Sequence, residues 1–126
     1  MDILKIEGTS QYPTVVLDKA GGRFEFSGNS LPEDATKFYT PIITWVEAYV
    51  AEPNPETLVR FKMAYYNTPS SKQIFQILKR FEGLSASGYK VEVLWVYNED
   101  DQDIKDSGKD LSGHLKLPFL FEECDD

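Results

Sequence analysis

The sequence predicts an α/β domain, built as a single mixed β-sheet with helices mainly on one of its faces. Three observations support this class. The chain has 126 residues, which suffices for one domain and not for two of ordinary size. Segments typical of strands are separated by segments with helical periodicity, which implies crossover connections and some parallel pairing. The longest alternating segment, 57–66, has apolar side chains on one side and charged ones on the other, as in a sheet covered on one face.

The first part of the chain predicts three short strands. Residues 3–7 (ILKIE) have the composition of the first one. An alternating pattern then occupies 15–18 and 23–27, on either side of Gly21-Gly22, which supplies a tight turn. These two segments therefore predict a β-hairpin.

A first helix is expected to begin at 32–34, where the run Pro-Glu-Asp places acids near the positive end of the helix dipole. Its apolar positions recur with helical spacing and comprise Phe38, Ile42, Trp45, Val46 and Tyr49. Pro41 lies within this stripe, and proline removes a hydrogen bond and clashes with the preceding turn. We therefore expect Pro41 to kink the helix or to restart it with Thr40 as the cap.

The segment 57–66 is the clearest strand in the sequence. Val59, Phe61, Met63 and Tyr65 occupy alternate positions in it and are expected to point to one side. Because such alternation is typical of a half-covered sheet, we expect these four side chains to face the helices.

The second half of the chain predicts a helix, a central strand and a weaker end. The apolar stripe of the second helix comprises Ile74, Ile77, Leu78 and Phe81. This helix is expected to end near Gly83 and to lead into a strongly apolar strand over 91–97. The segment 98–110 is read as a loop followed by a short helix, and 117–121 as an edge strand or a packed terminal segment.

The composition argues against several classes of partner and location. Acids outnumber bases by 21 to 13, giving a net charge of −8 and a pI of about 4.6, which disfavours binding to nucleic acids and anionic membranes. No apolar run has the length of a membrane span, and the first residues (MDILK) lack the apolar region of a signal peptide. The single cysteine, Cys124, cannot form an internal disulfide. We therefore expect a cytoplasmic protein with one domain over 1–126 and no membrane association.

Catalytic and metal sites have little support in the sequence. The only histidine, His114, excludes zinc sites built on several histidines, and no G-x-S-x-G motif is present. The acidic segment 99–110 contains residue types that bind magnesium or calcium, but Lys105 occupies the third ligand position counted from Asp101 in a calcium-loop pattern. We expect no cofactor and no metal. A small metal-dependent enzyme using this acidic segment, and an unmodified scaffold protein, are the alternative interpretations.

The segment 65–72 (YYNTPSSK) joins the clearest strand to the second helix. Thr68 suits the N-cap position and Pro69 the first helical position. Exposed amides at a helix start attract anions, so a phosphate on Thr68, Ser70 or Ser71 would lie near the positive end of the dipole. The spacing allows a phosphorylation switch, and a purely structural N-cap explains the same residues.

Four stretches of the chain carry a combination of motifs: 24–50, 65–72, 95–111 and 117–121. The first contains the run Ser-x-Pro-Glu-x-Ala-x-x-Phe-Tyr-x-Pro, which begins at Ser30. Together these stretches resemble the SiaC family of bacterial regulatory phosphoproteins, over nearly the whole chain and in the same order. The resemblance implies a fold similar to the STAS domains of anti-sigma-factor antagonists, a mixed sheet with helices packed on one side.

The resemblance also implies a regulatory switch and not an enzyme. In the family, a threonine at the start of the second helix is phosphorylated by a partner kinase with a histidine-kinase-like ATPase fold. A PP2C-type phosphatase removes the phosphate. The unphosphorylated form binds and activates an effector, a diguanylate cyclase, which links the switch to cyclic di-GMP and biofilm behaviour. The motif places this threonine on Thr68.

The residues around this threonine form the expected partner-binding surface. They are Asn67, Thr68, Pro69, Ser70, Ser71 and Lys72. The chain departs from the family pattern at Pro69, where serine is more common, so Ser70 and Ser71 are the alternative phosphate acceptors.

Overall fold

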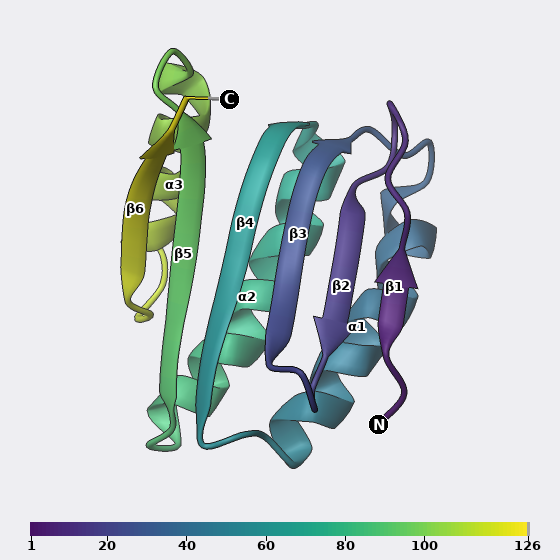
Figure 1. Ribbon diagram of the computed structural model, residues 1–126, viewed down its shortest axis with the longest axis vertical. Helices are drawn as coiled ribbons and strands as arrows, with labels where there is room; N and C mark the ends of the chain where they lie inside the picture. Colours follow the sequence, from purple (N-terminus) through teal and green to yellow (C-terminus); the bar gives the residue numbers. More distant parts are fainter. Residues whose placement is uncertain (126) are drawn as a thin grey trace.

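The computed structural model describes residues 1–125, which form one six-stranded sheet and three helices (Figure 1). The elements in chain order are β1 (Leu4–Ile6), β2 (Thr14–Asp18), β3 (Arg23–Ser30), α1 (Ala35–Ala51), β4 (Glu56–Tyr66), α2 (Thr68–Ala86), β5 (Lys90–Asn98), α3 (Gln102–Gly113) and β6 (Phe119–Cys124). This order confirms the sequence of strands and helices expected above, including the hairpin of β2 and β3 and the edge strand at the end.

The six strands lie side by side in chain order. β1, β2 and β3 pair antiparallel, whereas β3 with β4, β4 with β5 and β5 with β6 pair parallel. Parallel neighbours need crossover connections, and α1, α2 and α3 supply them. All three helices lie behind the sheet in Figure 1, which confirms the prediction of a single mixed sheet with helices on one face.

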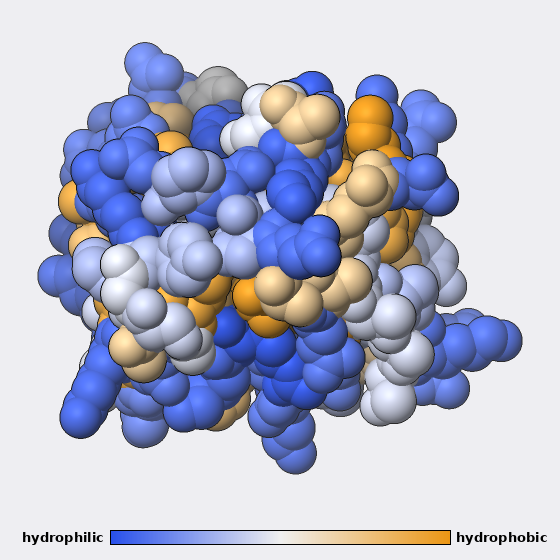
Figure 2. Space-filling model, turned by 90° about the horizontal axis from the view of Figure 1, so that it is seen from below, coloured by the Kyte–Doolittle hydropathy of each residue, from blue (hydrophilic) through white to orange (hydrophobic). Residues whose placement is uncertain are grey.

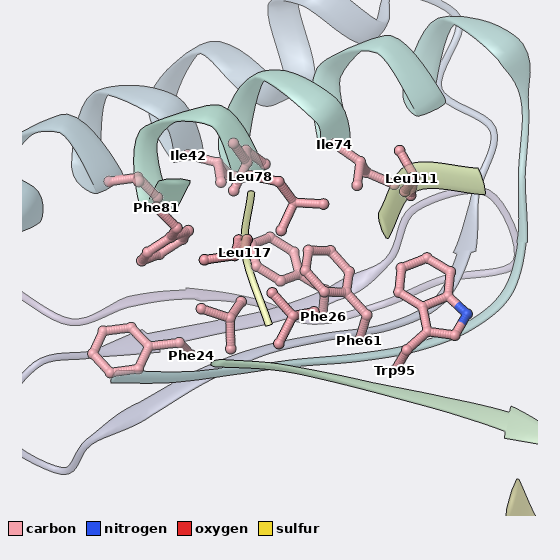
Figure 3. Packing of buried hydrophobic residues seen from close by; sticks show 14 of the residues in the cluster. Phe24, Phe26, Ile42, Phe61, Ile74, Leu78, Phe81, Trp95, Leu111 and Leu117 are labelled. Atoms are coloured by element: carbon pink, nitrogen blue, oxygen red, sulfur yellow. The ribbon is translucent and has the colours of Figure 1, made fainter. Parts of the chain in front are cut away.

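Aromatic side chains line the helix-facing side of the sheet. The rings of Phe26 and Phe61 stack with centroids 4.7 Å apart, and Phe61 lies 5.6 Å from Trp95. Figure 3 shows Ile42 of α1 and Leu78 of α2 packed over these rings. Burial of such large apolar surfaces dominates the stability of a domain of this size. The predicted stripe of α2 is confirmed, because all four of its residues are buried.

α1 continues through Pro41, so the expected restart with Thr40 as a cap is wrong. The N-cap is Asp34, whose Oδ1 accepts a hydrogen bond from the amide of Lys37 at 3.1 Å. Proline removes only one helical hydrogen bond here, the one to the Lys37 carbonyl, and Lys37 lies on the exposed side of the helix where water can replace it. The buried face of α1 also includes Tyr39, which the expected stripe lacked.

A β-bulge changes the orientation of side chains at the end of β4. The register between β3 and β4 shifts by one residue after the pair of Gly28 and Met63. A shift of one residue exchanges the two faces of a strand. Tyr65 is consequently 54% exposed, and Tyr66 packs instead against Trp95, with ring centroids 6.3 Å apart. The expectation that Tyr65 faces the helices is therefore wrong.

The segment 98–110 consists of a turn followed by α3, which confirms the expected loop and helix, with the helix beginning at Gln102. Asp101 caps α3 by accepting a hydrogen bond from the Ile104 amide at 3.0 Å. Gly108 lies directly against Trp95: a Cβ at this position would come within 2.5 Å of Cδ1 and 2.6 Å of Cε2. The indole Nε1 also donates to the Ile104 carbonyl at 2.9 Å. The glycine therefore allows α3 to approach the indole closely.

The opposite face of the sheet has no helix among residues 1–125. Leu58 and Leu120 lie on it and are 46% and 47% exposed.

Figure 2 shows one end of the molecule, the lower end of Figure 1, where hydrophilic residues cover most of the surface and apolar ones form small groups.

We predict that Gly108→Ala lowers the free energy of unfolding by about 1–3 kcal/mol, because the added methyl group must displace the Trp95 ring or α3. Urea denaturation followed by tryptophan fluorescence measures this change. Gly83→Ala is the matched control, since Gly83 lies inside α2 with no atom within 4 Å of the added Cβ. It should be stabilising by up to about 1 kcal/mol. A neutral Gly108→Ala would contradict the close packing of α3 on the sheet.

Candidate functional site

The expected partner-binding segment, 67–72, lies at the edge of the sheet where β3 and β4 end (Figure 1). Both strands point toward this edge and each is followed by a helix, so α1 and α2 begin there side by side. A groove lies between the first turns of these helices. It is lined by residues 33–36 of the α1 side and by Thr68, Pro69, Lys72 and Gln73 of α2. We call it the inter-helix groove. The carboxyl ends of parallel strands are a common place for functional sites in α/β folds.

The N-cap of α2 is Asn67 and not Thr68. The Asn67 Oδ1 accepts a hydrogen bond from the Ser70 amide at 3.0 Å, and its carbonyl accepts one from the Ser71 amide at 2.9 Å. Thr68 is thereby the first residue of the helix and Pro69 the second, which corrects the expected assignment by one residue. Within residues 1–125 the Thr68 hydroxyl makes no hydrogen bond, and the side chain is exposed. Its hydroxyl is therefore available for chemistry.

The first turn of α2 is poorly suited to bind a free anion, contrary to the expectation from the sequence. Pro69 has no amide hydrogen, and the amides of Ser70 and Ser71 already donate to Asn67. Anion sites at helix starts need several free amides. A phosphate at this position would thus have to be held covalently or by side chains.

Ser70 lies beneath this turn and is fully buried. Its Oγ accepts a hydrogen bond from Ser30 Oγ at 2.8 Å and donates one to the Ser30 carbonyl at 3.1 Å. Ser30 Oγ also lies 2.7 Å from the hydroxyl of Tyr39. Burial raises the pKa of Tyr39, so this hydroxyl keeps its proton. These hydrogen bonds join the helices α1 and α2 and the strand β3.

The charges of the inter-helix groove are mainly acidic. Glu33 and Asp34 are exposed on the α1 side, and Lys72 is exposed on the α2 side, one turn after Thr68. Residues four apart on a helix share a face, so Lys72 and Thr68 line the same wall. Ser71 is half-buried. The structure therefore brings Thr68, Pro69 and Lys72 together at the groove and places Ser70 in the core.

The remaining candidates of the sequence do not converge on a second site. Within residues 1–125, no group of three or more His, Cys, Asp or Glu side chains is placed to hold a metal ion. The acidic segment 99–110 contributes the cap of α3 and exposed side chains. His114 is the C-cap residue of α3, and its Nδ1 lies 2.8 Å from the Asp110 carbonyl. No helix in the described part of the chain has the length and apolarity needed to cross a membrane.

Two residues of the site, Ser30 and Tyr39, were not found from the sequence as functional candidates. Both belong to the run Ser-x-Pro-Glu-x-Ala-x-x-Phe-Tyr-x-Pro, which was noted only as a motif. Ser30 ends β3, and Tyr39 follows the next loop in α1. Two hydroxyl side chains on either side of one loop could have indicated a shared hydrogen bond. Their common partner, Ser70, is 40 residues further along the chain from Ser30.

A comparison with known families shows to which family the chain belongs. The family model described as SiaC family regulatory phosphoprotein matches residues 6–124. The chain belongs to the SiaC family. The resemblance noted in the sequence is thereby confirmed over almost the entire length.

Several SiaC relatives cover the chain completely or nearly so. An uncharacterized protein of Pseudomonas aeruginosa (strain UCBPP-PA14) is 26% identical over 126 residues, which is 100% of both chains. The structure of SiaC of Pseudomonas aeruginosa superimposes with a TM-score of 0.90 at 26% identity, covering 98% of this chain and 100% of that one. A chain in the crystal structure of the diguanylate cyclase SiaD in complex with its activator SiaC also gives a TM-score of 0.90 at 26% identity, covering 96% and 99%. The protein described here therefore shares the fold of SiaC.

We predict that Asn67→Ala lowers the free energy of unfolding by about 1 kcal/mol, because it removes the side-chain cap of α2. Thr68→Ala is the neighbouring control and should stay within about 0.5 kcal/mol of the unsubstituted protein, since Thr68 caps nothing. Urea denaturation measures both values. The reverse order of the two effects would show that Thr68 is the cap.

Proposed function

We propose that this protein is a phosphorylation-controlled binding switch, in which Thr68 accepts the phosphate and the unmodified form binds and activates a diguanylate cyclase. The observation that carries the proposal is the Thr68 hydroxyl, which is exposed at the wall of the inter-helix groove and unused within residues 1–125. The effector class is supported by the relative SiaC, which is the activator of the diguanylate cyclase SiaD in their complex.

The surroundings of the three hydroxyls favour Thr68 as the acceptor. Ser70 Oγ is fully buried and makes two hydrogen bonds, so a kinase could reach it only after the first turn of α2 had opened. Ser71 is half-buried, whereas Thr68 is exposed. Thr68 needs no rearrangement to be modified.

The charge of the groove explains how a phosphate would control binding. Phosphorylation adds about −1.5 to −2 charges at neutral pH. Glu33 and Asp34 already lie across the groove, and the whole chain carries a net charge of −8. The cation Lys72 lies on the α2 wall of the groove, as Thr68 does. A partner surface that complements the unmodified groove would have to desolvate this dianion and would be repelled wherever it is acidic.

The proposed switch is acted on by other enzymes and is not an enzyme itself. A kinase with a histidine-kinase-like ATPase fold adds the phosphate, and a PP2C-type phosphatase removes it. We propose that both enzymes and the effector act in the cytoplasm together with this protein. The family's description as regulatory phosphoproteins supports this assignment.

We predict that incubation with the partner kinase and ATP increases the intact mass by about 80 Da, the mass of one phosphoryl group. Peptide mapping should place the phosphate on Thr68. Thr68→Ala should show no gain, whereas Ser71→Ala should gain the phosphate as the unsubstituted protein does. A phosphate that maps to Ser70 or Ser71 would overturn the assignment of the acceptor.

We predict that Thr68→Asp weakens binding to the diguanylate cyclase by at least about tenfold, which corresponds to about 1.4 kcal/mol. In Thr68→Asn the new side chain has nearly the same size as aspartate and no charge, so this variant should bind within about threefold of the unsubstituted protein. Isothermal titration calorimetry at low and high salt measures both. The difference should shrink at high salt because the groove is exposed. Equal affinities for the Asp and Asn variants would place the control of binding elsewhere.

A further inference from the structure

Three hydroxyl groups form a buried chain directly below Thr68. They belong to Ser30 at the end of β3, Tyr39 in α1 and Ser70 in the first turn of α2, and all three residues have no exposed surface. The distances are 2.7 Å between the Tyr39 Oη and Ser30 Oγ, and 2.8 Å between Ser30 Oγ and Ser70 Oγ. The proposed function assigns no role to these groups.

The donors and acceptors of this hydroxyl chain can be in only one order. A serine hydroxyl has a single proton, and that of Ser30 is donated to Ser70 Oγ. The contact between Tyr39 and Ser30 therefore requires the tyrosine to be the donor. Ser70 Oγ donates its own proton to the Ser30 carbonyl at 3.1 Å. The direction thus runs from Tyr39 through the Ser30 hydroxyl to Ser70 and ends on the Ser30 carbonyl.

The last acceptor of the chain also holds the segment that precedes Thr68. The Ser30 carbonyl accepts a hydrogen bond from the Asn67 amide at 3.1 Å as well as the one from Ser70. Asn67 and Ser70 in turn bond to each other through the N-cap. Thr68 and Pro69 are therefore an exposed two-residue segment whose two flanking residues are attached to the same carbonyl oxygen.

A merely space-filling role would be met more simply by apolar side chains. Buried hydroxyls are unfavourable unless each finds a partner, and a chain of three satisfies itself only if β3, α1 and α2 keep their relative positions. This arrangement specifies one position for the start of α2 where apolar packing alone would allow several.

We propose that Ser30, Tyr39 and Ser70 are positioning residues that hold the first turn of α2 closed, so that Thr68 is presented to partners on a preformed surface. Ser70 is thereby assigned to holding the turn and not to accepting phosphate. The part of this inference that concerns presentation to partners rests on the proposed function, whereas the holding of the turn does not.

Hydrogen exchange of the amides of Asn67, Ser70 and Ser71 tests the proposal in the full chain. In Ser70→Ala the hydroxyls of Ser30 and Tyr39 share one hydrogen bond, so one of their two protons is a buried donor without an acceptor, whereas Tyr39→Phe removes a donor and leaves only an acceptor unpaired. We expect exchange at these three amides to rise by about tenfold or more in Ser70→Ala and by a smaller factor in Tyr39→Phe, beyond any change in the slowest-exchanging core amides.

Tyr49→Phe is the matched control. Tyr49 lies on the same helix and is equally buried, but its hydroxyl bonds to Thr57 Oγ1 at 2.7 Å, near the opposite end of α1. It should lower global stability without opening the turn, so exchange at the three amides should follow the core. The proposal is overturned if Tyr39→Phe and Tyr49→Phe affect the three amides alike. It is also overturned if Ser70→Ala accelerates their exchange less than Tyr39→Phe does.

Affinity for the diguanylate cyclase is the second measurement. Tyr39→Phe and Ser70→Ala should weaken binding of the unphosphorylated protein by about threefold to tenfold, because a loosened surface must be ordered again on binding. Tyr49→Phe should leave it unchanged. If the unsubstituted protein neither binds the cyclase nor accepts phosphate, the proposed function fails while the exchange experiment still decides the role of the chain.

Discussion

The parallel pairing of β3, β4, β5 and β6 in chain order is the constraint on which the candidate site depends. Crossovers between parallel neighbours are right-handed, so an order that never reverses places every connecting helix on the same face. α1 and α2 consequently start at the same edge of the sheet (Figure 1). This geometry brings Glu33 and Asp34, before α1, next to Thr68, 34 residues after Asp34, although no local pattern connects them.

Two layers with opposite properties meet at this edge. Below, aromatic packing and the hydroxyl chain of Ser30, Tyr39 and Ser70 hold β3, α1 and α2 together in one arrangement. Above, Thr68 is exposed in a groove that is mainly acidic. This arrangement fits the proposed control by modification, in which a phosphate would be added without unfolding and its charge would act on a preformed surface.

Periodicity in the sequence predicted the elements that depend on a single buried face. The stripe of Ile74, Ile77, Leu78 and Phe81 is fully confirmed, because side chains three and four apart must share one side of a helix. Prediction was less accurate where a contact distant in the sequence decides the local structure. Tyr65 points outward because of a bulge against β3, a contact that the alternation along β4 does not reveal. Thr68 and Asn67 are both good caps, so composition alone could not place the start of α2 to the residue.

The sequence by itself determined the order of strands and helices, their apolar faces, the family and the segment of the candidate site. The order and the apolar faces follow from local spacing, whereas the family and the candidate segment follow from the resemblance of motifs read in order along the chain. Only the tertiary structure decided which hydroxyl of that segment is exposed and which is buried. The reason is that Ser70 is held by Ser30 and Tyr39, which come from other elements, while Thr68 meets no partner within residues 1–125. Two hydroxyls separated by a single residue thus have opposite environments, and the difference depends on contacts across 40 residues of chain.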